Sequence, residues 1–261
     1  MKTRIISGLC MVPLLAIVYF GSYPLVAMCI LIGFIGVREL FRGFNAMDIH
    51  PSYNIAYVFL FALYALNGFF PSEHEYIIAW LVAGVMASSI YIFKINERKI
   101  EDALATMLGL VYVIFFSFHV VLVDQTGPYS ILIWLVLISA FATDICAYFS
   151  GVFLGKHKLC PNLSPKKTIE GAVGGVLGCM ICCALFAHFF APFLMVHCMI
   201  IGFIASIMSM CGDLTASAYK RKMGIKDYGT LIPGHGGIMD RFDSVLFTAP
   251  IVYYYIIFVL A

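Results

Sequence analysis

Charged residues are scarce in this chain of 261 residues: they make up 11% of it, whereas hydrophobic residues make up 62%. A soluble domain usually carries about 25% charged and about 45–50% apolar residues. A water-soluble fold could not cover this much apolar surface with so few polar groups, so lipid must be the solvent. The composition therefore argues against a soluble enzyme and predicts an integral membrane protein.

The sequence shows no convincing signal peptide, and its cysteines do not suggest a disulfide framework. Residues 1–20 combine a basic start with an apolar run, but no clear small-residue cleavage site follows, so we expect a retained first span. Most of the nine cysteines lie within apolar runs or at their ends. Cys179, Cys182 and Cys183 have no second cluster of metal-ligand spacing, so packing explains them better than a metal centre does.

The sequence does contain a series of long apolar runs. Because a membrane-spanning helix needs about 20 mostly apolar residues, we predict an all-α, polytopic integral membrane protein with about nine transmembrane helices. The predicted spans are 5–20, 24–40, 53–70, 76–93, 103–123, 129–150, 171–190, 194–219 and 241–260. We expect 1–128 to be a scaffold of membrane helices and 129–261 to be the catalytic part, with polar loops at 151–170 and 220–240.

The basic residues favour one orientation of these spans. If the N-terminus is cytoplasmic, all sixteen Lys and Arg fall in inner segments. The predicted outer loops then hold Glu73, Glu75 and Asp124 but no basic residue. This distribution follows the positive-inside rule and predicts that both polar loops face the cytoplasm.

Two acids, Asp144 and Asp213, lie inside predicted spans. A charged side chain there costs about 2.5–3.5 kcal/mol on insertion scales and is a functional candidate, unless it forms a structural ion pair or reaches water. Asp213, Ser217 and Lys220 follow the spacing i, i+4, i+7 and share one helix face. Asp144 and Tyr148 share a face in the same way. Alternatively, both sets of residues could form ordinary polar helix faces packed on other spans.

A glycine-rich turn at 233–237 leads directly into the last predicted span. Such a turn can present several backbone N–H groups to a phosphate near a helix N-terminus. His235 could be a general base, a turn residue or a hydrogen-bond donor to phosphate. The residues of this region that we assign to substrate and phosphate binding are Arg221, Lys226, His235, Gly236, Gly237 and Arg241.

Asp240 and Asp243 lie three positions apart on the first turn of the last helix and share a face. The helix dipole favours carboxylates there. Carboxylate oxygens are also the ligands that Mg²⁺ prefers, and Mg²⁺ commonly bridges them to substrate phosphates. The alternative is helix capping together with a contact between Arg241 and lipid headgroups.

The second polar segment, 155–171, reads GKHKLCPNLSPKKTIEG. It lacks the spacing of a Walker loop, but Lys156, Lys166 and Lys167 are candidates for phosphate binding. The alternative is an inner loop that merely obeys the positive-inside rule. Two lysine-rich loops and several carboxylates at the inner membrane boundary favour phosphoryl or nucleotidyl transfer to a lipid, because that chemistry depends on positioning and charge neutralisation.

Two motifs then point to a family. Residues 217–243 read S-x-x-K-R-x-x-x-x-K-D-x-G-x-x-x-P-G-H-G-G-x-x-D-R-x-D, and residues 144–151 read D-x-x-A-Y-F-x-G. Together with S-P-K-K-T-x-E-G in the other polar loop, the sequence resembles the phosphatidate cytidylyltransferases, or CDP-diacylglycerol synthases. Cys146, Val152 and Ile169 depart from the expected pattern, at positions where glycine, arginine and tryptophan are common.

The resemblance implies an activity and a site. Such enzymes convert CTP and phosphatidate to CDP-diacylglycerol and pyrophosphate with Mg²⁺, and a second, monovalent cation is expected to share the site. It implies Asp213 and Asp240 as metal ligands. Ser217, Lys220 and Asp243 match further functional positions, and we expect Asp144 to act with them. The resemblance also implies a homodimer, with no nucleic-acid partner, in a bacterial inner membrane.

Two other classes of function compete with this interpretation. An ion-coupled transporter also carries acids inside its spans, but its site is expected near the bilayer midplane and its halves are often repeated. A CTP-dependent lipid kinase would share the substrates but would transfer only the γ-phosphate. A phosphatidyl-alcohol transferase is disfavoured because its D-G-x-x-A-R…D-x-x-x-D pattern is absent.

Overall fold

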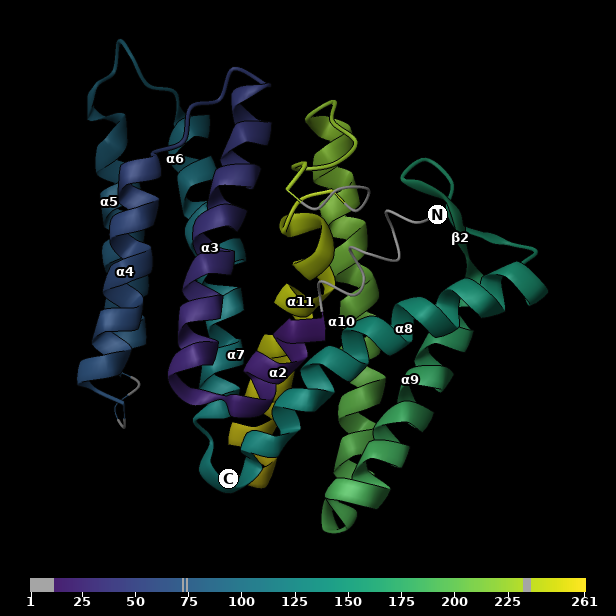
Figure 1. Cartoon of the computed structure of the whole chain (residues 1–261). Coiled ribbons are helices and arrows are strands. Elements are labelled where there is room, and N and C mark those ends of the chain that lie inside the picture. The colour runs from purple at the N-terminus through teal and green to yellow at the C-terminus, as the bar shows by residue number, and fades with distance from the viewer. Residues whose placement is uncertain (1–11, 72, 74, 232–235) are drawn as a thin grey trace. The chain divides into compact units, whose positions relative to one another are not determined.

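The computed structural model describes residues 12–71, 73, 75–231 and 236–261 (Figure 1). The chain divides into two compact units. The first contains residues up to Val121 together with Lys222–Arg241, and the second contains Leu122–Arg221 and Phe242–Ala261.

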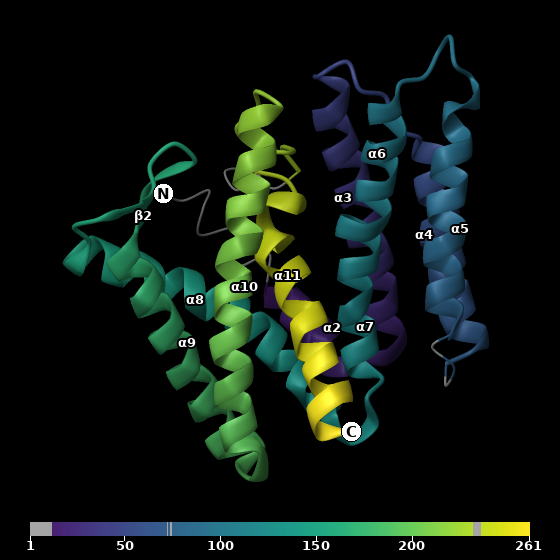
Figure 2. The same cartoon turned by 180° about the vertical axis from the view of Figure 1, so that it is seen from behind.

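The first unit is a group of packed helices in which α3 contacts α4 and α4 contacts α5. Its helical elements are α2 (Val12–Phe20), α3 (Ser22–Asn45), α4 (Tyr53–Phe69), α5 (Glu75–Ile90), η1 (Tyr91–Phe93), α6 (Ile100–Leu108), the π-helical η2 (Gly109–Phe115) and the start of α7 (Phe116–Asp124). Figure 1 shows α3, α4 and α5 running side by side, and Figure 2 shows the same from behind. Leu25, Phe41, Leu60 and Phe118 are fully buried between these helices and form the apolar core of this unit.

The second unit is built around a closely packed helix pair, α8 and α9. Its elements are η3 (Gly127–Leu132), α8 (Ile133–Leu154), β1 (Lys158–Cys160), β2 (Ser164–Thr168), α9 (Ile169–Phe190), η4 (Pro192–Leu194), most of α10 (Met195–Lys222), most of α11 (Met239–Tyr255) and the π-helical η5 (Ile256–Leu260). The Ser244 hydroxyl on α11 donates to the Ser209 carbonyl on α10 at 3.2 Å. The Thr248 hydroxyl donates to the Val136 carbonyl on α8 at 3.1 Å, so polar contacts supplement the packing.

The predicted helical, polytopic architecture is confirmed. Within the described ranges, seven helical stretches are long and apolar enough to cross a membrane. They are Ser22–Asn45, Glu75–Phe93, Ile100–Asp124, Gly127–Leu154, Ile169–Phe190, Pro192–Lys222 and Met239–Leu260. The span predicted at 53–70 is the shorter apolar helix Tyr53–Phe69, and the one predicted at 5–20 is described only from Val12. The count of nine and the cytoplasmic N-terminus stay predictions.

The all-α prediction needs one correction: the polar loop predicted at 151–170 contains a two-stranded antiparallel hairpin. Lys158 pairs with Thr168 and Cys160 pairs with Ser164. The Leu163 amide donates to the Cys160 carbonyl at 3.1 Å and closes a four-residue turn with Pro161 and Asn162 at its centre. Proline presets the backbone angle needed at the second position of such a turn, and asparagine is common in turns, so this local sequence accounts for the hairpin.

Small residues allow α8 and α9 to approach closely below the hairpin. A Cβ atom at Gly171 would meet the Ala147 carbonyl oxygen at 2.8 Å, which is too short for a real side chain. A Cβ atom at Gly175 would meet the Thr143 carbonyl at 3.1 Å. The glycines therefore allow the first two turns of α9 to lie directly against α8.

In the first unit, a buried carboxylate connects the start of α6 to the segment that precedes α4. Asp102 is 1% exposed. Its two oxygens accept hydrogen bonds from the backbone amides of His50 at 2.6 Å and Lys99 at 2.9 Å. A charged acceptor stabilises a buried amide, so this side chain stabilises both the segment before α4 and the segment before α6.

We predict that Asp102→Ala lowers the free energy of unfolding by about 1–3 kcal/mol, because two buried donors lose a charged acceptor. The measurement is the thermal unfolding midpoint of the purified protein in detergent micelles. Glu101→Ala is the matched control: this neighbouring side chain is exposed, and its loss should change stability by less than about 0.5 kcal/mol. Equal midpoints for the two variants would contradict the assignment.

Candidate active site

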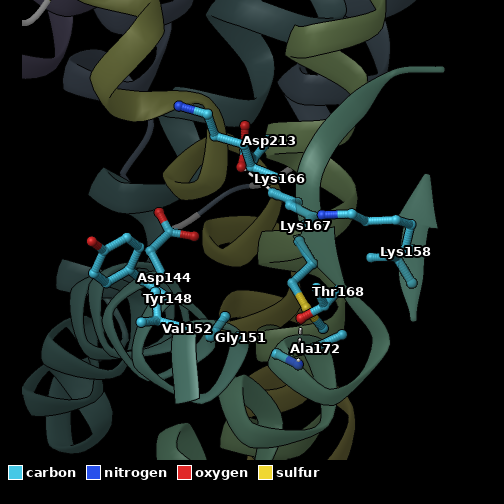
Figure 3. A pocket seen from close by; sticks show the side chains of 14 residues that line it. Asp144, Tyr148, Gly151, Val152, Lys158, Lys166, Lys167, Thr168, Ala172 and Asp213 are labelled. Carbon is cyan, nitrogen blue, oxygen red and sulfur yellow. Dashed lines mark hydrogen bonds and ion pairs between the residues drawn. The ribbon is translucent and has the colours of Figure 1, made fainter. Parts of the chain in front are cut away.

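The second unit contains a cavity of about 500 Å³ between α8, the hairpin, the start of α9 and α10 (Figure 3). Four residues predicted for the site line it: Asp144, Lys166, Lys167 and Asp213. The rest of its lining is Ala147, Tyr148, Gly151, Val152, Lys158, Leu159, Thr168, Gly171, Ala172 and Met210. The structure thus brings acids from two helices and lysines from one hairpin to a single cavity.

An ion pair joins the hairpin to α10 inside this cavity. The Lys167 ammonium pairs with the Asp213 Oδ2 oxygen, and the two side chains are 26% and 27% exposed. The Ser217 hydroxyl, one helical turn along α10, donates to Asp213 Oδ1 at 3.4 Å. Both oxygens of Asp213 therefore have a partner, which accounts for an acid at this depth in a predicted span.

A third acid belongs to the same cluster. Asp243 on α11 is 7% exposed, and its Oδ1 oxygen accepts the Ser244 amide at 2.7 Å. Its carboxylate interacts electrostatically with Asp213, Lys220 and Asp144. Asp144, Asp213 and Asp243 therefore form an acidic cluster with Lys167 and Lys220 as the nearby cations. This arrangement brings together residues from α8, α10 and α11.

The hairpin is fixed to α9 by two side chains at the start of that helix. Thr168 is the N-cap, and its hydroxyl accepts the Gly171 amide at 3.1 Å, as N-cap residues typically do. Glu170 accepts the amide of Lys156 at 3.1 Å and that of His157 at 3.2 Å, and lies 2.6 Å from His157 Nδ1. Glu170 therefore fixes residues 156 and 157, which directly precede β1, and so helps to position the hairpin whose lysines line the cavity.

The first unit contains a second group of carboxylates, around the start of α11. Asp240 is 8% exposed, and its Oδ2 oxygen accepts the Gly237 amide at 2.9 Å and the Tyr228 amide at 2.8 Å. Gly236 has a φ of 86°, in the left-handed region that favours glycine. The Gly237 amide is thus engaged inside the turn, and the phosphate-binding role assigned to Gly236 and Gly237 stays a prediction.

Glu39 on α3 is an acid that the sequence analysis missed. It is 7% exposed, and its two oxygens accept the amides of Ile238 at 3.1 Å and Met239 at 2.9 Å. The signal was present, since Glu39 lies inside the span predicted at 24–40. The criterion that selected Asp144 and Asp213, an acid within a span, applied to it equally.

Several residues that were predicted to bind substrate do not line this cavity. Lys156 is exposed in the link between α8 and β1, and its amide donates to Glu170. Arg221 and Lys226 are exposed, at the end of α10 and in the following loop, and Arg241 is partly buried on α11. His235 lies outside the described residues.

The carboxylates of the site are the side chains that could coordinate Mg²⁺. Among the residues that the structure describes, no three His, Cys, Asp or Glu side chains form a ready metal cage. Mg²⁺ usually takes only one or two carboxylates and completes its shell with water and substrate phosphates. Carboxylates beside lysines, without soft ligands, therefore fit an ion that binds together with a phosphate substrate.

A polytopic helical chain whose cavity combines lysines with carboxylates is typical of a membrane enzyme that handles phosphate groups. Residues 2–259 match the cytidylyltransferase family. The chain therefore belongs to the cytidylyltransferase family, and the resemblance seen in the motifs is confirmed.

The similarity to curated relatives extends over nearly the whole chain. A phosphatidate cytidylyltransferase of Synechocystis sp. is 33% identical over 98% of this chain and 97% of its own. The enzyme of that name from Bacillus subtilis is 30% identical over 97% of both chains. The one from Thermotoga maritima is 33% identical over 97% of this chain and 95% of its own.

We predict that Glu170→Ala loosens the segment that leads into β1 without unfolding the protein. Amide hydrogen exchange in the segment 155–160 should accelerate about 10- to 100-fold, because bonds to a charged acceptor contribute about 1.5–3 kcal/mol. Lys156→Ala is the matched control, since it removes an exposed side chain and keeps the amide that Glu170 binds. Unchanged exchange in Glu170→Ala would show that the strand is held by its backbone ladder alone.

Proposed function

We propose that this chain transfers the cytidylyl group of CTP to phosphatidate and so forms CDP-diacylglycerol and pyrophosphate for phospholipid biosynthesis. The observation that carries the proposal is the family match over residues 2–259. The cavity supports it independently, since lysines suit phosphates and carboxylates suit a cation that bridges phosphates.

The reaction needs no protein nucleophile. A phosphate oxygen of phosphatidate attacks the α-phosphorus of CTP, and the bond from that phosphorus to the oxygen shared with the β-phosphorus breaks. The electron pair leaves with pyrophosphate. Since the phosphate of phosphatidate is largely ionised near neutral pH, the protein has to align two anions and offset their repulsion.

The lysines of the hairpin and of α10 would supply the positive charge. Lys158, Lys166 and Lys167 line the cavity. Lys220 lies near the acidic cluster and interacts with Asp243. Cations held in a partly enclosed site attract phosphates more strongly than they would in bulk water, because the local dielectric constant is lower. We assign Lys166, Lys167 and Lys220, with Arg221, to the phosphates.

Mg²⁺ would be held by Asp213 and Asp240, and when bound it would neutralise phosphate charge. Two observations support carboxylates in this role. Asp213 belongs to a cluster in which three acids interact, so several carboxylate oxygens of the kind that Mg²⁺ prefers lie near one another. Asp240 precedes Asp243 by three residues on the continuous helix α11, so the two carboxylates share a helix face. Ser217 is proposed to orient Asp213 through its hydrogen bond.

We further propose that the site faces the cytoplasm, as the placement of all sixteen Lys and Arg indicates. CTP would then reach the cavity from the aqueous side, while phosphatidate would remain in the bilayer. The scaffold role of 1–128, the catalytic role of 129–261 and the homodimer remain part of the proposal.

The assay that tests the function uses purified protein in detergent–lipid micelles with phosphatidate, Mg²⁺ and CTP labelled at the α-phosphate. We expect labelled lipid and pyrophosphate from the wild type. Asp240→Asn should nearly abolish turnover at normal yield, because the amide lowers the charge available to a divalent cation. Asp48→Asn is the control, since this carboxylate is exposed on the loop after α3.

Other products would reject the proposal. CDP without pyrophosphate would identify a lipid kinase, and no nucleotide turnover by folded protein would favour a transporter. Wild-type activity in Asp240→Asn would remove this residue from the metal site.

We predict that Lys220→Ala lowers kcat/KM about 100- to 1000-fold, as expected when one charge-stabilising contact worth about 2.7–4 kcal/mol is lost. Lys222→Ala is the matched control, because it removes an exposed lysine two residues further along the same helix. Steady-state kinetics with both variants checks the difference. A fall in protein yield alone, with normal kinetics of the folded fraction, would mark Lys220 as structural.

A further inference from the structure

Glu39 joins parts of the chain that are far apart in sequence. Its carboxylate on α3 lies 199 and 200 residues from the two amides it accepts, those of Ile238 and Met239. The first amides of an α-helix have no partner within the helix, and the helix dipole makes that end favourable for negative charge. Glu39 therefore caps α11 from a different helix, with both of its oxygens.

Two glycines of the segments that precede α11 allow the backbone to lie close to this carboxylate. A Cβ atom at Gly229 or at Gly237 would overlap the Glu39 carboxylate. A Cβ atom at Gly229 would also meet the Cα of Gly237 at 3.2 Å. The two glycines therefore let the backbone of residues 229 and 237 lie directly against Glu39.

Asp240 holds the same turn from within. It accepts the amides of Tyr228 and Gly237, while Glu39 accepts those of Ile238 and Met239. Three consecutive amides, 237–239, thus donate to two carboxylates. Any shift of the turn relative to Glu39 would also move the groups that orient Asp240.

A purely structural explanation fits poorly with the charges. Glu39 and Asp240 are close enough for their charges to repel. A side chain needed only for packing inside a span would not place a carboxylate beside another one, because burial and like charge both oppose it. The free-energy cost of burying Glu39 beside Asp240 is understandable if Glu39 is needed to position the Asp240 carboxylate.

We infer that Glu39 is a positioning residue, which fixes the backbone at residues 228–229 and 237–239 and thereby orients the Asp240 carboxylate for a divalent cation. This inference rests on the proposed function, in which Asp240 holds Mg²⁺. Glu39 acts through Asp240 and the turn and does not itself touch substrate. Partners of metal-binding residues typically change affinity or activity 10- to 100-fold when they are altered.

The test compares Glu39→Gln and Glu39→Asp with the wild type. Glutamine keeps the shape but leaves an NH₂ group facing one of the two amides, whereas aspartate keeps the charge on a shorter side chain. For Glu39→Gln we expect kcat to fall about 10- to 100-fold and the Mg²⁺ concentration for half-maximal activity to rise at least about fivefold. Glu39→Asp should recover part of both losses.

Hydrogen exchange of the peptide 228–240 gives a readout that does not require activity. Its exchange should accelerate about tenfold in Glu39→Gln, since one bond to the start of α11 is lost. Glu97→Gln is the matched control, because its carboxylate is exposed on the loop between η1 and α6. It should leave the kinetics, the Mg²⁺ dependence and the exchange unchanged.

A double-mutant cycle with Gly229→Ala tests the contact directly. The added methyl group should reduce activity strongly when Glu39 is present and less in Glu39→Ala, because the carboxylate it overlaps is gone and the contact with the Gly237 Cα at 3.2 Å is left. If Glu39→Ala fails to accumulate, Glu39→Asp replaces it, and a smaller loss is again expected. Losses that simply multiply would argue against the contact.

The inference and the proposed function can fail separately. Normal kcat and normal Mg²⁺ dependence in Glu39→Gln would overturn the inference, whether or not the unfolding temperature falls. If the wild type makes no CDP-diacylglycerol, the proposed function fails. Unchanged exchange of 228–240 in Glu39→Gln would then also exclude the anchoring of the turn.

Discussion

A carboxylate taken out of water must find hydrogen-bond donors or a cation, and both units of this protein are organised around that requirement. In the first unit, Glu39 and Asp240 are satisfied by backbone amides around the start of α11. In the second, Asp213 is satisfied by Lys167 and Ser217. Lipid offers no such partners, so each acid fixes the segment that supplies them. The cost of burial therefore becomes a means of ordering loops that would otherwise have little to pack against.

The hairpin illustrates how this ordering serves the cavity. It has only two short strands, and two-stranded hairpins are marginally stable in water by themselves. Glu170 holds its entrance, Thr168 caps the helix into which it leads, and Lys167 pairs with Asp213 on α10. Its lysines are consequently presented by a supported strand rather than by a flexible loop, which reduces the conformational entropy lost when phosphates bind.

Sequence patterns predicted much of this. Apolar runs predicted the helical membrane architecture, and acids within spans pointed to Asp144 and Asp213. Glu39 met the same criterion, but it lies near the end of a span between Arg38 and Arg42, where an acid resembles an ordinary residue of the membrane boundary. The hairpin was missed because Pro161-Asn162 is a short turn signal inside a basic loop.

Other features depend on three-dimensional proximity and had no sequence signal. Glu170 binds the amide of His157, which lies 13 residues away, and no periodicity encodes such a contact. The positions that depart from the family pattern have different surroundings: Val152 lines the cavity, whereas Cys146 packs where a Cβ at Gly178 would lie. The association of Asp213 with Asp240 in one metal site stays a prediction.

One further consequence concerns the α8 wall of the cavity. Tyr148 and Val152 line it (Figure 3) and yet are 67% and 61% exposed, so the cavity has an apolar wall that is open to its surroundings. If this wall meets the bilayer, a lipid that approaches there would keep its tails in hydrocarbon while its headgroup enters among lysines. For such a protein the effective quantity of lipid substrate is its mole fraction in the membrane plane, and adding inert lipid dilutes it even when its bulk concentration is constant.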